Sequence, residues 1–224
     1  MGLNYQSIRK LGSGCGLFAS CIVIAACSLA PKIPVVSDER LDLLVRSEAR
    51  QLLSVADPGA DTSTYQFQIS NFPRADLLGL SIGGGRIYIS YKLAQLASQT
   101  GYHRWLLRQT LAHEIAHELA GHVHRNGAVA NTPSGANGVS AQDLGLAPSI
   151  RFQNYPLEKE LQADLLGLNY WVQLGWDCAI WVDILRQFQK AQYAGDVHHP
   201  TDRRLQQAMA SCAAMHSAQL SMRH

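Results

Sequence analysis

The sequence predicts an α+β fold that is mainly α, with one small β-sheet. Long apolar patterns of helical period fill most of the chain after residue 36, whereas only two short stretches alternate as strands do. The composition, 47% hydrophobic and 16% charged over 224 residues, suits one globular domain with a sizeable core. We therefore expect a single domain over residues 37–224.

The residues before this domain resemble a bacterial lipoprotein signal peptide. Arg9 and Lys10 precede an apolar run that is too short for a comfortable transmembrane helix and ends in small residues before Cys27. We expect residues 1–26 to be removed, Cys27 to be lipidated, and residues 27–36 to form an extended tether. A competing cleavage site at Cys21 and an uncleaved N-terminal anchor are the alternatives.

A lipid-anchored chain of this kind belongs in the bacterial cell envelope, facing the periplasm. Ser28, directly after the cysteine, resembles lipoproteins that are sent on to the outer membrane. The 19 basic and 17 acidic residues nearly balance, so nothing suggests nucleic acid as a partner. In an oxidising periplasm Cys178 and Cys212 can form a disulfide, and two separate buried thiols are the equal alternative.

The domain is predicted to begin with a packing helix and the small sheet. Ser37 and the two acidic residues after it form a helix start, and a leucine-rich stripe continues the helix to about Ala56. Residues 65–69 alternate as a strand, and a second strand, Arg86–Ser90, follows three glycines. That second strand is either an ordinary buried strand or one to which an extended substrate adds as a further strand.

The rest of the chain is predicted to be helical apart from one long loop. The loop covers residues 126–156, which are rich in Gly, Ala, Ser, Asn and Pro, and we expect it to lie over or beside the functional site. Helical patterns cover residues 91–98, 103 to about 125, 157–174, 177–193 and 202–219.

The run LAHEIAHELAGH at residues 111–122 carries the chemistry. His113 and His117 are four residues apart, so on a helix their side chains lie on one face about 5–6 Å apart and can meet one Zn²⁺. Glu114 is a third of a turn away, which is the position of a general base acting on a water activated by the metal. The pattern predicts one zinc ion per chain.

A third ligand has to come from a later part of the chain. The metzincin spacing would need a glycine at position 120 and a histidine at 123, and Ala120 and Val123 exclude it. The predicted helix at 157–174 supplies Glu160 as a ligand, and Asp164 one turn on can orient a zinc-bound histidine through its free ring N–H.

These motifs together resemble a zinc metallopeptidase family that includes HtpX, the CAAX prenyl endopeptidases and periplasmic or mitochondrial quality-control proteases. The resemblance rests on HEIAH at 113–117 and ELQAD at 160–164. It is strengthened by GGRIYI at 84–89, by Gly121-His122, and by His199-Pro200 with Arg204. It implies a zincin-like domain with a small sheet beside the histidine helix.

The same resemblance implies that His199 and Arg204 act at the site. Either residue is expected to stabilise the oxyanion of the substrate carbonyl. His199 has a second option, because an imidazole on a mobile loop can occupy the open zinc position and hold the enzyme inactive. His199→Ala would then raise proteolysis.

The function expected from these observations is a membrane-anchored zinc metalloendopeptidase. Its substrates would be unfolded or misassembled envelope proteins, cleaved in protein quality control. A latched, chaperone-like lipoprotein that binds zinc and clients with little proteolysis is the alternative, and a zinc-storing lipoprotein, which would not need Glu114, is a third option. The oligomeric state stays open.

Overall fold

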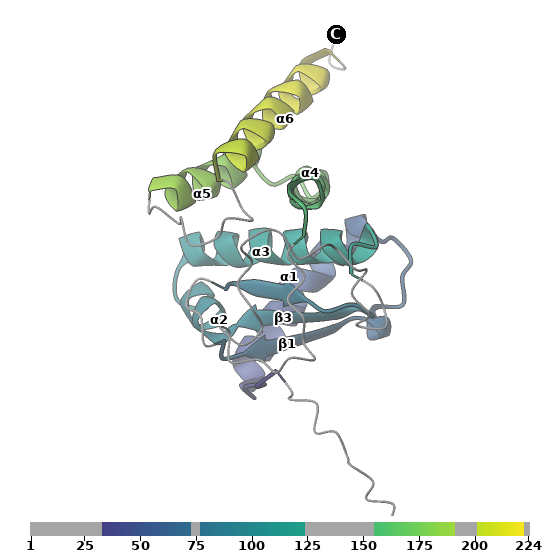
Figure 1. Ribbon diagram of the computed structural model, residues 1–224, viewed down its shortest axis with the longest axis vertical. Coiled ribbons are helices and arrows are strands. Elements are labelled where there is room, and N and C mark those ends of the chain that lie inside the picture. Colours follow the sequence, from purple (N-terminus) through teal and green to yellow (C-terminus); the bar gives the residue numbers. More distant parts are fainter. Residues whose placement is uncertain (1–32, 73–76, 124–154, 191–200, 222–224) are drawn as a thin grey trace, which may run out of the picture.

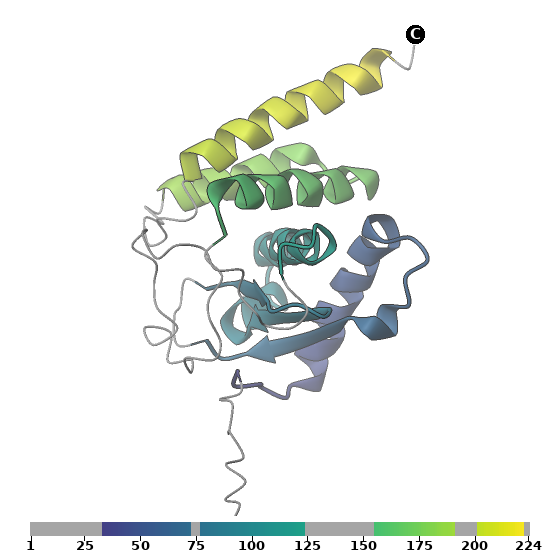
Figure 2. The same ribbon diagram turned by 45° about the vertical axis from the view of Figure 1, so that its right-hand side comes forward.

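The long helix α3 (Gly101–Leu119) lies between a small sheet on one side and three later helices on the other (Figure 1, Figure 2). The computed structural model describes residues 33–72, 77–123, 155–190 and 201–221. Its elements are α1 (Glu39–Ala56), a 3₁₀ turn η1 (Thr62–Thr64), β1 (Gln66–Ser70), β2 (Gly79–Ser81), β3 (Arg86–Ser90), α2 (Tyr91–Ala97), α3 (Gly101–Leu119), α4 (Leu157–Gln173), α5 (Cys178–Lys190) and α6 (Thr201–Ser221). The expectation of a mainly helical α+β fold is confirmed.

The domain begins before α1. Asp38 caps that helix by accepting the Leu41 N–H at 3.1 Å. Residues 33–36, predicted to belong to the tether, are extended but lie against the domain. Ile33 is buried beside Phe72, and the Val36 N–H donates to the Ile69 carbonyl at 2.8 Å. Residues 33–36 therefore pack on the domain that was predicted to begin at residue 37, because Ile33 finds apolar partners beside the sheet and the backbone of Val36 bonds to β1.

The sheet has three strands in the order β1-β3-β2. β1 pairs with β3 in parallel, and β2 pairs with it antiparallel. β3 has the bounds that its sequence predicted, but it is the central strand and both of its edges are occupied. The hypothesis that a substrate adds to residues Arg86, Ile87, Tyr88 and Ile89 is therefore wrong, since their backbone groups already serve β1 and β2.

Helix α3 ends six residues earlier than predicted. Its last residue is Leu119, and Gly121 follows with φ 66°. The His122 N–H donates to the His117 carbonyl, and the Gly121 N–H donates to the Glu118 carbonyl, which together form a Schellman ending. This turn folds His122 back toward the helix that it follows.

Helix α4 packs against α3 at the level of the histidines. A Cβ placed on Gly167 would come within 3.1 Å of the Ala112 carbonyl carbon and 2.9 Å of the Trp181 ring. Only a glycine allows the two helices to approach so closely. The approach places Glu160 and Asp164 of α4 beside His113, the residue after Ala112. In the described part of the chain, no helix is long and apolar enough to cross a membrane.

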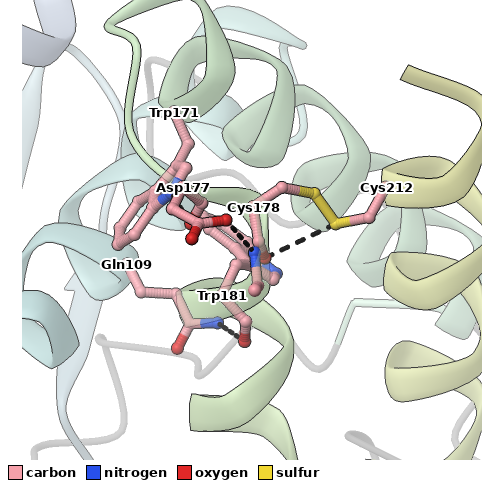
Figure 3. The surroundings of a disulfide bond; sticks show 7 residues. Gln109, Trp171, Asp177, Cys178, Trp181 and Cys212 are labelled. Atoms are coloured by element: carbon pink, nitrogen blue, oxygen red, sulfur yellow. Dashed lines mark hydrogen bonds between the residues drawn. A yellow bond between two sulfur atoms is a disulfide. The ribbon is translucent and has the colours of Figure 1, made fainter. Parts of the chain in front are cut away.

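Helices α5 and α6 are joined by a disulfide between Cys178 and Cys212, whose Cα atoms are 5.8 Å apart (Figure 3). Of the two options that the sequence left open, the structure has the bonded pair. Figure 3 also shows how this end of α5 is held to the core. The Trp171 indole N–H donates to the Asp177 carbonyl at 2.9 Å, and the Gln109 amide donates to the Trp181 carbonyl at 3.4 Å.

Candidate metal centre

Three side chains from two helices converge in the buried layer between α3 and α4. His113 and His117 come from α3 and Glu160 from α4, and one ligand atom from each lies within 4.8 Å of the others. The Nε2 atoms of the two histidines are 3.0 Å apart. The Glu160 carboxylate lies 3.2 Å from His113 Nε2 and 3.6 Å from His117 Nε2. All three residues are at most 9% exposed. This group can hold a metal ion.

The second ring nitrogen of His113 is bound to an anchored carboxylate. Nδ1 lies 2.9 Å from Asp164 Oδ1, and Arg204 donates to both oxygens of the same carboxylate, at 2.5 and 2.7 Å. Burial alone would raise the pKa of Asp164, but Arg204 and His113 lower it well below its usual range. An ionised carboxylate only accepts hydrogen bonds, so His113 Nδ1 carries a proton. Its Nε2 then faces the cluster.

The charge balance favours a cation at the point where the three side chains meet. Burial alone would lower the pKa of His113, but hydrogen bonds to Asp164 and Glu160 raise it to about 10. Burial and the charge of His113 lower the pKa of His117. Without a metal, a proton on His113 Nε2 supplies the positive charge that the carboxylates require. Two imidazole nitrogens and one carboxylate also form a donor set that suits Zn²⁺, so the residues fit that ion.

Glu114 lies beside this group and is held by the edge strand. Its Oε2 accepts the Ser81 backbone N–H at 2.8 Å. Gly79 permits the contact, because a Cβ there would come within 3.0 Å of the Glu114 side chain and 2.6 Å of Thr110. One turn on, Glu118 accepts the Ser81 hydroxyl and the Gly85 N–H, each at 2.6 Å. Two glutamates of α3 therefore fix β2 and the turn after it.

The structure places some predicted site residues at this centre and others elsewhere. Asp164 contacts His113, as its spacing suggested. The described contacts of Arg204 are with Asp164, on the side of His113 away from His117 and Glu160. Its expected role at the oxyanion stays a prediction without a supporting contact. His199, Cys27 and nearly all of the loop 126–156 lie outside the described residues.

Two further residues contact His117, and sequence reasoning gave no role to the first of them, Tyr155. Tyr155 stacks on the His117 ring, with centroids 4.1 Å apart and an interplanar angle of 21°. Its buried hydroxyl has no hydrogen-bond partner among the described residues, and burial with the nearby carboxylates raises its pKa. The sequence left open whether His122 is a surface residue or lies behind a ligand; it is only 5% exposed, and its Nδ1 lies 3.0 Å from His117 Nδ1. The only sequence signal for this position of His122 was Gly121, a residue type that often ends a helix.

Fold and site together define a mainly helical α+β domain with a buried His-His-Glu group that can hold a metal ion. Among known proteins, no family model matches this chain, and no curated protein is significantly similar to it.

Proposed function

We propose that the chain is a zinc metalloendopeptidase with a zincin-like fold, related to the family that its motifs resemble. The observation that carries the proposal is the pairing of two features in one buried place. His113, His117 and Glu160 converge on one point, and Glu114, which is not needed for that group, lies next to it with its carboxylate already aligned by Ser81. A site that only stored zinc would not require that carboxylate.

In this proposal the ligands are His113, His117 and Glu160. Zinc held there would polarise a peptide carbonyl and increase the acidity of a water molecule. Glu114 accepts the proton of the attacking water on its carboxylate and passes it to the amine that leaves. Asp164 and Arg204 keep His113 oriented through this cycle.

Strand β2 replaces β3 as the place where an extended substrate would bind. No other strand among the described residues pairs with the outer edge of β2. Leu78 and Ile82 bond to β3, so by the alternation of an antiparallel pair Gly79 and Ser81 present their backbone groups outward. The Ser81 N–H contacts Glu114, so this edge ends at the proposed general base. An edge of this kind favours unfolded segments, which can adopt an extended form.

Location and substrates rest on the sequence. The lipoprotein-like N-terminus supports a lipid-anchored protein of the cell envelope, facing the periplasm and most simply on the outer membrane. The clients proposed are unfolded or misassembled envelope proteins.

The test uses the purified full chain, with metal content measured by mass spectrometry and casein as the substrate. We expect about one zinc per chain and cleavage, with cleavage reduced roughly 10²–10⁴-fold and zinc retained in Glu114→Gln. Glu158→Gln, which removes an exposed carboxylate of α4, is the matched control. Absence of zinc would overturn the proposal. Zinc and casein binding without cleavage would favour the latched, chaperone-like alternative.

A further inference from the structure

His122 is buried against His117 although it does not belong to the His113-His117-Glu160 group. It is buried after the end of α3, where the Schellman turn at Gly121 folds it back. Its Nδ1 lies 3.0 Å from His117 Nδ1, and its Nε2 lies 3.1 Å from the side-chain oxygen of Gln162 in α4. Gln162 of α4, His122 in the turn after α3 and His117 of α3 thus form a chain of contacts that ends at the His117 ring.

If His117 Nε2 binds a metal, the hydrogen bonds between His117, His122 and Gln162 allow only one placement of the ring protons. A metal-bound imidazole uses the lone pair of Nε2, so the proton of neutral His117 is on Nδ1. That N–H can donate only if His122 Nδ1 accepts. Neutral His122 then carries its proton on Nε2, and the Gln162 oxygen accepts it. Every donor in this chain of contacts has an acceptor.

The geometry also shows that His122 is not a fourth ligand. Its contact is with Nδ1 of His117, which is the ring nitrogen opposite the one that faces Glu160. The two proposed histidine ligands therefore have different supports. His113 bonds to an anionic carboxylate held by Arg204, whereas His117 bonds to a neutral imidazole held by an amide.

We propose that His122 is a positioning residue, which fixes the ring and the tautomer of His117 so that Nε2 is presented to the metal, with Gln162 fixing His122 in turn. This inference rests on the metal site of the proposed function, and it assigns a role to a residue outside the ligand motif. Loss of an outer partner of this kind typically lowers metal affinity by roughly 10–100-fold.

The experiment measures zinc affinity of the full chain by chelator competition. His122→Ala should weaken zinc binding by roughly 10–100-fold. His122→Asn should recover much of the loss, because its side-chain oxygen can accept the His117 N–H. Gln162→Ala should show a smaller loss, since it removes only the outer link. His216→Ala, at an exposed position of α6, is the matched control and should bind like the wild type.

A second readout reports the tautomer directly. Long-range ¹H–¹⁵N spectra of the zinc-loaded wild type should show His117 protonated at Nδ1, and the visible spectrum of the cobalt-loaded chain should change in His122→Ala and return toward wild type in His122→Asn.

The outcomes separate the two proposals. Wild type without zinc would overturn both. Zinc binding that is unchanged in His122→Ala, or equally weak in the alanine and asparagine variants, would overturn the role of His122 and leave the metal site standing.

Discussion

Two buried glutamates, Glu48 in α1 and Glu160 in α4, are both contacted by side chains of α3, and they are neutralised in different ways. Glu48 is completely buried, and Arg104 and Arg108 each donate to one of its oxygens at 2.6 Å. Arg108 in turn lies over two tryptophan rings, Trp105 and Trp176, at 4.3 and 4.6 Å. The Glu160 carboxylate instead lies beside two imidazoles, at 3.2 Å from His113 Nε2 and 3.6 Å from His117 Nε2.

The difference lies in the permanence of the positive charge. A guanidinium is always charged, so the Glu48 cluster is complete with the residues that the chain supplies. An imidazole is positively charged only after it takes up a proton. In its neutral form it offers a lone pair instead of a charge. The Glu160 cluster is therefore completed by a proton or by a metal ion. The comparison separates an ion pair that supports the fold from a group that can hold a metal ion.

The largest effect is expected for Glu160→Gln. Removing the one carboxylate of the proposed ligand set should lower zinc affinity by more than the roughly 10–100-fold typical of outer partners, and zinc should be lost on dialysis. Metal analysis after dialysis checks this. Zinc retained at one per chain would show that Glu160 is not a ligand.

Glu48→Gln should affect stability and leave zinc content unchanged. It leaves Arg108, whose side chain is 15% exposed, without its buried counter-charge. The free energy of unfolding should fall by about 3 kcal/mol, toward the low end for broken buried pairs because the Arg104 side chain is 46% exposed. Urea unfolding of the zinc-loaded and metal-free protein measures this. A matching loss of zinc would contradict the separation of the two clusters.

Asp164→Asn should have an intermediate effect on the metal. The asparagine keeps the shape but removes the charge that Arg204 and His113 share, so zinc affinity should fall by roughly 10–100-fold with the fold retained. Chelator competition and circular dichroism would be measured together. Unaltered affinity would mean that the contact to His113 is structural only.

The most graded effect, small for each step in pH, is expected from a change of pH. The pKa of His113 is raised to about 10, so in the metal-free protein this residue adds stability that is complete below pH 6.5 and is lost as the pH rises toward 10. Zinc has to displace that proton. Its apparent affinity should therefore rise by about tenfold per pH unit between pH 7 and 9, with a proton released on binding. Calorimetry in buffers of different ionisation enthalpy would detect the release, and pH-independent binding without it would contradict this account.

Local patterns predicted the elements that have strong local signals. β3 and the start of α4 at Leu157 have the predicted bounds, and the period of α3 put His113 and His117 on one face. β2 was missed because it has three residues and begins with a glycine, so it offers no alternation to read. The end of α3 was placed too late because its apolar pattern runs on past Gly121, where the backbone turns.

The sequence by itself determined which chemical groups are present and which of them share a helix, because the helical repeat relates residues three and four apart. That is enough to indicate two histidine ligands, a neighbouring base and the glutamate and aspartate of a later helix. Only the tertiary structure decided what those groups contact. The approach at Gly167 set α4 against α3, the turn after Leu119 put His122 behind His117, and the strand order left β2 as the open edge. Each of these depends on packing between segments far apart in the chain, for which a local pattern carries no information.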